Sequence, residues 1–177
     1  MRYSMLKSAD ISEDGLYRYK LGRLWNSKKG VIGWLMLNPS TADANIDDPT
    51  IRKCIGFSER WGYGEIQVVN LWAYRSTDPK KLLEIHDPFG PKNWEHIDYV
   101  CSFCDTIVAA WGNEVIIRRL NKNGLSAFDT VNQIRFRHPH LAIKCLGKSN
   151  NGNPYHPLML PYDTELRDYF EKDEVFD

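Results

Sequence analysis

Four apolar runs along the chain predict the central strands of a sheet. Each run is almost continuously apolar, which is typical of parallel strands that are buried on both faces. The expected strands are residues 33–37, 65–73, 105–111 and 141–146.

Between these runs, apolar residues recur at helical spacing, which predicts helices that pack against the sheet. The expected helices are residues 50–61, 79–85, 93–102, 114–120 and 127–136, with a short C-terminal helix at 164–170. Near the N-terminus, residues 17–21 and 24–25 predict an antiparallel hairpin that turns at Gly22-Arg23. Strands that alternate with helices predict a three-layer α/β/α fold, with a central, mainly parallel four-stranded sheet plus the N-terminal antiparallel hairpin.

Polar residues follow each expected strand at its carboxyl end. They are Asn38-Pro39-Ser40, Asn70, Trp111-Gly112-Asn113 and the loop 148–157. Pro39 lacks a backbone donor and biases Asn38 toward an extended conformation, so the first strand should stop there. Parallel strands place their carboxyl ends at one rim, which is where open α/β sheets bind ligands. The sequence therefore predicts one ligand site at this rim.

Length and composition predict a single domain over residues 1–177. A chain of 177 residues, 42% of them hydrophobic, is expected to bury roughly two-thirds of its unfolded surface. No apolar run is long enough to span a membrane. The first thirty residues carry charges throughout and lack a signal-peptide core, so a cytoplasmic location is expected.

The charges of the chain balance, with 23 Lys and Arg against 23 Asp and Glu. This argues weakly against a large phosphate-binding footprint, because proteins that bind nucleic acids are usually basic. A local basic stripe on a neutral chain remains open. Of the four cysteines, Cys101 and Cys104 have the spacing of metal and redox sites, but there is no second such pair. Buried structural cysteines are therefore expected, and no metal or cofactor is predicted.

Four segments together carry a specific resemblance. They are Leu37-Asn38-Pro39-Ser40-Thr41-Ala42-Asp43, Asp47-Asp48-Pro49-Thr50-Ile51-Arg52-Lys53-Cys54, Trp61-Gly62-Tyr63-Gly64 and Asn70-Leu71. In these segments the chain resembles a family of bacterial and viral proteins known as domain of unknown function 1643, over about residues 17–161. The family name supplies no activity.

A second, more distant resemblance does imply an activity. Asn38-Pro39, Asn70, Trp111-Gly112 and His156-Pro157-Leu158 occur in the order in which the uracil-DNA glycosylase superfamily carries similar motifs at its strand ends. The resemblance implies that Asn38 holds the attacking water, Asn70 reads the base and His156 stabilises the oxygen of the leaving base. It also implies that backbone amides from Ser40 and Thr41 to Asp43 grip a phosphate or the base.

Other details are left open by the sequence. Trp111, Asn113 and Tyr155 are further candidates for substrate binding, although Asn113 could only cap the next helix. The aromatic residue that stacks on the base is open among Trp34, Phe57, Trp72 and Tyr155, for which core packing is the default. Residue 38 is Asn rather than Asp, so a general base must come from elsewhere; Asp43 is the first candidate, with Asp47 and Asp48 as alternatives.

The expected function is that of a monofunctional DNA glycosylase acting on a modified or non-standard base, as in antiviral defence against modified viral DNA. The expected partner is double- or single-stranded DNA with a flipped base, bound by a monomer without metal, cofactor or membrane. Two alternatives remain. One is a nucleic-acid or nucleotide-binding module without catalysis, and the other is a nucleotide hydrolase that uses Asp47 and Asp48 with magnesium.

Overall fold

One seven-stranded sheet forms the centre of the molecule, in the order β1-β2-β4-β3-β5-β6-β7. The computed structural model describes residues 5–112, 114–122 and 126–170. The strands are β1 (Leu6–Ile11), β2 (Arg18–Leu24), β3 (Val31–Met36), β4 (Glu65–Asn70), β5 (Thr106–Ala109), β6 (Ala142–Cys145) and β7 (Arg167–Asp168). The helices are α1 (Pro49–Arg60), α2 (Asn93–Phe103), α3 (Glu114–Lys122) and α4 (Ala127–Arg137), with 3₁₀ turns η1 (Pro79–Leu83) and η2 (Pro157–Met159).

The sheet is partly parallel. Strands β4, β3, β5 and β6 are parallel neighbours, whereas β1, β2 and β7 are antiparallel to the strands beside them. The α/β class is therefore confirmed. The expected four-stranded sheet is not confirmed as such, because the four parallel strands belong to one seven-stranded sheet that antiparallel strands extend at both edges.

The two chain ends account for this difference. The expected turn at Gly22-Arg23 lies inside β2, and the antiparallel partner of β2 is β1. A Cβ atom at Gly22 would lie 2.6 Å from Ser8 Oγ and 2.9 Å from Gln67 Nε2, so glycine here admits side chains from both neighbouring strands. The glycine marks close contact between strands, and the sequence gives no local sign of it.

The C-terminal segment was expected to be helical over residues 164–170, and this prediction is wrong. Its central part is β7, which pairs with β6. Lys144 Nζ lies 2.6 Å from Asp168 Oδ1, and the Tyr169 amide donates to the Ile143 carbonyl at 2.9 Å. Pairing with the open edge of the sheet outweighs the weak helical pattern of this short segment.

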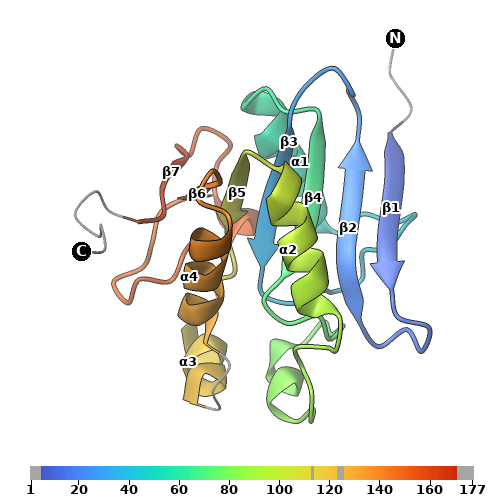
Figure 1. The fold of residues 1–177 in the computed structure, drawn as a ribbon, viewed down its shortest axis with the longest axis vertical. Helices are drawn as coiled ribbons and strands as arrows, with labels where there is room; N and C mark the ends of the chain where they lie inside the picture. The colour runs from blue at the N-terminus through green and yellow to red at the C-terminus, as the bar shows by residue number, and fades with distance from the viewer. Residues whose placement is uncertain (1–4, 113, 123–125, 171–177) are drawn as a thin grey trace.

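Helices cover both faces of the sheet (Figure 1). On one face, α1 packs against Trp34 and Val68, and the Trp34 indole donates to the buried Ser58 hydroxyl at 3.0 Å. On the other face, α2, α3 and α4 pack against residues such as Leu35 and Ile107. The strands are apolar on both faces, so helices can pack against each face and form three layers.

The connections place a topological switch point at the centre of the sheet. The chain runs from β3 through α1 to β4 on one side of β3, and then through α2 to β5 on its other side. Ligands of open α/β folds bind outside the carboxyl ends of the strands at such a point. In this fold the switch point lies between β3 and β5.

All four cysteines are buried and free, as the sequence predicts. Burial raises the pKa of the Cys101 and Cys104 thiols to about 12, so both remain protonated at neutral pH. Thiols in this state are poor nucleophiles. Among the described residues, no helix has the length and apolar character needed to cross a membrane.

Candidate functional site

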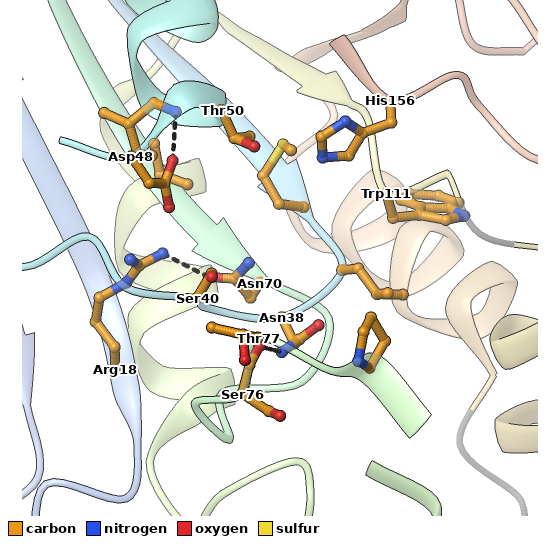
Figure 2. A pocket seen from close by; sticks show the side chains of 15 residues that line it. Arg18, Asn38, Ser40, Asp48, Thr50, Asn70, Ser76, Thr77, Trp111 and His156 are labelled. Carbon is orange, nitrogen blue, oxygen red and sulfur yellow. Dashed lines mark hydrogen bonds between the residues drawn. The ribbon is translucent and has the colours of Figure 1, made fainter. Parts of the chain in front are cut away.

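A cavity of about 320 Å³ opens at the switch point, which is within the usual size range of small-molecule sites. Its walls come from the ends of β3, β4 and β5, the start of α1, and the loops that contain Ser76 and His156. Figure 2 shows the side chains that line it. Segments far apart in the sequence therefore meet at one rim of the sheet. This is the rim at which the polar residues after the strands predicted a ligand site.

Six of the residues singled out in the sequence line this cavity. They are Asn38, Ser40, Asp48, Asn70, Trp111 and His156. Thr41, Asp43, Asp47 and Tyr155 do not line it. Asn113 lies outside the described residues.

Asn38 is held by the loop that follows β4. Its Nδ2 donates to the Ser76 carbonyl at 2.9 Å and to the Pro39 carbonyl at 3.1 Å. These bonds use the amide hydrogens and fix the side chain, which leaves the Oδ1 atom as the group able to accept a hydrogen bond from a ligand or water. Asn38 itself lies two residues after the end of β3 and directly before Pro39.

Asn70 ends β4 and is 1% exposed. Its Oδ1 accepts a long hydrogen bond, at 3.4 Å, from Arg18 Nη2 (Figure 2). This orients the amide so that Nδ2 is the free donor on the cavity side. The strand end is itself fixed by Asn93, whose Nδ2 donates to the Asn70 carbonyl at 3.0 Å.

His156 is presented as a neutral hydrogen-bond donor. Its Nδ1 accepts from the Leu158 backbone amide at 3.2 Å, so the ring proton resides on Nε2. Burial lowers the pKa of His156, and the more distant Asp48 carboxylate opposes this only in part. The ring is therefore neutral at neutral pH, with Nε2–H available to the cavity.

The loop that carries His156 is fastened to the end of β5. Trp111 Nε1 donates to Asn153 Oδ1 at 3.2 Å, and the Gly112 amide donates to the Pro154 carbonyl at 3.0 Å. Trp111 is 2% exposed and lines the cavity. Of the other aromatic candidates, Trp34, Phe57 and Trp72 are buried in the core, whereas Tyr155 is 44% exposed on the loop.

The three candidate carboxylates have different surroundings. Asp43 Oδ1 accepts from the backbone amides of Asn45 and Ile46 at 2.7 and 2.9 Å, and these bonds lower its pKa. It therefore stabilises a turn, as an Asx cap does. Asp47 pairs with Arg23 at 2.6 Å and also with Lys7.

Asp48 is the carboxylate that lines the cavity. It caps α1, where Oδ1 accepts from the Ile51 amide at 2.9 Å and Pro49 occupies the first helical turn. The cap uses one carboxylate oxygen and leaves the other for the cavity. On sequence grounds Asp43 ranks above Asp48 as the candidate base. The geometry of the turn decides which of these acids points to the rim, and the sequence does not show that geometry.

Arg18, Thr50, Ser76 and Thr77 also line the cavity and were not singled out in the sequence. Arg18 is almost fully buried in β2, where its Nη1 donates to the Ala42 carbonyl at 2.8 Å. An arginine at the start of a strand gives no signal of its own. The position of β2 beside β4 brings it next to Asn70.

Comparisons with known proteins identify a family. No curated protein and no solved structure gave a match. The model of the family described as "Protein of unknown function (DUF1643)" matches residues 18–158, which is most of the chain. The matched region contains every described residue named above as lining the cavity. The chain therefore belongs to the DUF1643 family.

Proposed function

We propose that the protein is a DNA glycosylase-like enzyme that hydrolyses the N-glycosidic bond of a modified or non-standard base in DNA. The observation that carries this proposal is the meeting of Asn38, Asn70 and His156 in one cavity at the switch point. A base must leave the helical stack to enter such a cavity, and its polar edge must then find hydrogen-bond partners.

The base-recognition part of the proposal rests on Asn70 and Trp111. The oriented Nδ2 of Asn70 suits a carbonyl oxygen on the polar edge of a base. Trp111 is the aromatic side chain in the cavity wall besides His156, and aromatic rings hold flipped bases by stacking. Together they would read a pyrimidine-like edge and hold its ring.

The leaving-group part rests on His156. When the glycosidic bond breaks, its electron pair goes to the departing base, and negative charge develops on the base oxygens. A neutral Nε2–H in a partly buried site can donate a hydrogen bond to that charge, which is an effective form of electrostatic catalysis.

The attacking water is assigned to Asn38 and Asp48. Asn38 Oδ1 accepts a hydrogen bond from the water and orients it, but an amide cannot take its proton. Asp48 supplies the carboxylate that takes the proton as the water oxygen bonds to the sugar C1′ atom. The general base is thus assigned to Asp48 in place of Asp43, whose carboxylate caps a turn.

The test uses single- and double-stranded oligonucleotides that each carry one modified base, followed by alkaline cleavage at abasic sites. Wild-type protein should generate cleavage at one or more of these bases. His156→Ala should lower the rate by about 100-fold or more, and Asn38→Ala and Asp48→Asn should also lower it. The exposed His140 gives a matched control, since His140→Ala should leave the rate unchanged.

The proposal fails if no abasic product forms across uracil, oxidised and glycosylated bases. A second candidate function, a binding module without catalysis, would then be selected by DNA affinity with a steep salt dependence. The zero net charge of the chain favours this second candidate. The magnesium-dependent hydrolase has less support, because Asp47 is engaged with Arg23 and Lys7 while Asp48 faces the cavity.

A further inference from the structure

We infer that the Arg18 end of the cavity is an anion-binding subsite, so that the ligand carries a carboxylate or phosphate group beside the edge that Asn70 reads. The inference rests on the proposed function for the identity of the ligand as a base or nucleotide. It deepens that function by assigning an acidic substrate class.

The first observation is a buried guanidinium with an unused donor. Arg18 is 2% exposed, and its side chain donates to the Ala42 carbonyl and, at 3.4 Å, to Asn70 Oδ1. Its Nε atom is buried and has no hydrogen-bond partner in the described part of the chain. Figure 2 shows the guanidinium directed toward Asn70, below the Asp48 carboxylate.

The second observation is the missing counter-charge. Within residues 5–112, 114–122 and 126–170, no carboxylate oxygen lies within 4.0 Å of an Arg18 nitrogen. Arg23 on the same strand is also buried, but it pairs with Asp47 at 2.6 Å. A buried charge without a partner costs free energy. Arg23 has such a partner and is therefore structural, whereas Arg18 lacks one and is available to pair with an anionic ligand.

Arg18 keeps its positive charge at neutral pH, and two other arginines act on it. Burial lowers the pKa of Arg18 to about 10, so the group is still positive at neutral pH. Asp48 and Asp43 attract it from a distance, whereas Arg75 and Arg23 repel it. Arg75 has its own buried Nε atom without a partner among the described residues. An anion placed here relieves the repulsion between the two guanidinium groups.

The geometry suits a group that offers two acceptor oxygens. An arginine presents parallel N–H donors that match a carboxylate or phosphate at two points. Asn70 Nδ2 lies beside it and supplies a third donor to the same ligand. A neutral base would leave the cation unpaired. The anion can belong to a substituent on the base or to the phosphate of the flipped nucleotide, and the experiment separates these sources.

The experiment measures binding by calorimetry, with no turnover required. The probes are uracil, uracil-5-carboxylate, deoxyuridine, deoxyuridine 5′-monophosphate and inorganic phosphate. Wild-type protein should bind at least one anionic probe about tenfold or more tightly than its neutral counterpart, which corresponds to about 1.4 kcal/mol. Preference for uracil-5-carboxylate would place the anion on the base, and preference for the monophosphate would place it on the nucleotide.

Two variants of Arg18 and a control test the residue. Arg18→Gln should reduce the affinity for the preferred anion to that for the neutral probe. Arg18→Lys should restore this affinity only in part, because lysine keeps the charge but lacks the paired N–H donors of the guanidinium group. Arg119→Gln, on the exposed side of α3, should change neither affinity. Asp48→Asn retains the helix cap but removes a nearby negative charge, so it should tighten anion binding. This last variant tests the inference even if Arg18→Gln does not fold.

Equal affinity for neutral and anionic probes, or an anion preference that survives Arg18→Gln, would overturn the inference. So would failure of both anionic probes and phosphate to bind. The outcome is independent of the glycosylase test. Release of a neutral base without anion preference would contradict the anion subsite and support the glycosylase. Anion preference without abasic product would support the subsite and contradict the glycosylase.

Discussion

Gly112 and His156 are packed so closely that a Cβ atom at residue 112 would lie 2.9 Å from His156 Cβ. Gly112 also has a φ of +57°, a conformation that glycine adopts at little cost. It lies directly after Trp111, at the point where the loop with His156 is fastened to the end of β5. The position of the proposed leaving-group donor therefore depends on the lack of a side chain at residue 112.

Gly112→Ala should destabilise the protein and weaken the cavity's ligand binding, because the methyl group pushes His156 away. Gly152→Ala is the matched control, since Gly152 has a φ of +79° and no atom within 4 Å of the added Cβ. Both variants should lose about 1 kcal/mol of unfolding free energy from the backbone conformation. Urea unfolding measures that loss, and only Gly112→Ala should also lower activity. Equal activity in the two variants would contradict the assigned role of the contact.

The rate of the proposed glycosylase reaction should be flat through neutral pH and fall only in acid. Burial lowers the pKa of His156 below its usual value near 6.5. Protonation would occur on Nδ1 and break its bond from the Leu158 amide, so the active neutral form is lost as the pH falls through the lowered pKa. His156→Gln keeps an N–H donor but does not titrate. Its residual rate should lack the acidic decline that the histidine causes, and an unchanged decline would assign the titration to another group.

Asn70→Asp should preserve the fold while abolishing base recognition. The new carboxylate would accept from Arg18 Nη2 more strongly than the amide oxygen does, so thermal stability should not fall. It would lack the Nδ2 donor and fill the proposed anion subsite, and ligand affinity should drop at least tenfold, about 1.4 kcal/mol.

Asn153→Asp is the control for this charge change. Asn153 Oδ1 accepts from Trp111 Nε1, a role that a carboxylate keeps, and the residue does not line the cavity. Calorimetry on the two variants should show loss of binding in the first and retention in the second. Ligand binding by Asn70→Asp at the wild-type affinity would remove Asn70 from the recognition site.

Asp47 should contribute to the loss of stability in acid. Burial raises its pKa, but hydrogen bonds from Arg23 and Lys7 lower it by more, so the folded value is below the usual one. A carboxyl with a depressed folded pKa stabilises the protein above the unfolded pKa, near 4, and loses this effect as the pH falls through the folded value.

Asp47→Asn should therefore lower stability at neutral pH, by about 3 kcal/mol, because it leaves the buried Arg23 without a charged partner. It should also reduce the further loss between pH 4 and more acidic conditions. Urea unfolding at several pH values measures both effects, with Asp163→Asn as a control on an exposed carboxylate. Parallel pH curves for wild type and Asp47→Asn would show that another group dominates acid unfolding.

Much of the site could be predicted because it depends on local pattern. The apolar runs locate β3, β4 and β5, and the polar residues after them locate the rim on which Asn38, Asn70 and Trp111 meet. The burial of the cysteines followed from composition and spacing in the same way.

What could not be predicted depends on contacts between distant segments. From the sequence alone, Gly22 is typical of a turn, but β2 lies between β1 and β4 and Gly22 lies inside it. The same strand order places Arg18 next to Asn70. The choice among Asp43, Asp47 and Asp48 depends on the path of a short loop, which composition does not determine. The C-terminal strand depends on an open sheet edge that no local pattern reveals.

Side chains in and next to the sheet hold the loops around the cavity in place. Arg23 donates to the carbonyls of Asp43 and Ile46, and Asn38 donates to that of Ser76. These backbone segments have therefore already lost their conformational freedom when the protein folds, and a ligand need not order them again. Its affinity should be set by the match of its polar groups rather than by loop closure. Chemically similar bases can then differ sharply in affinity, because a cavity lined by fixed segments cannot change shape to fit each of them.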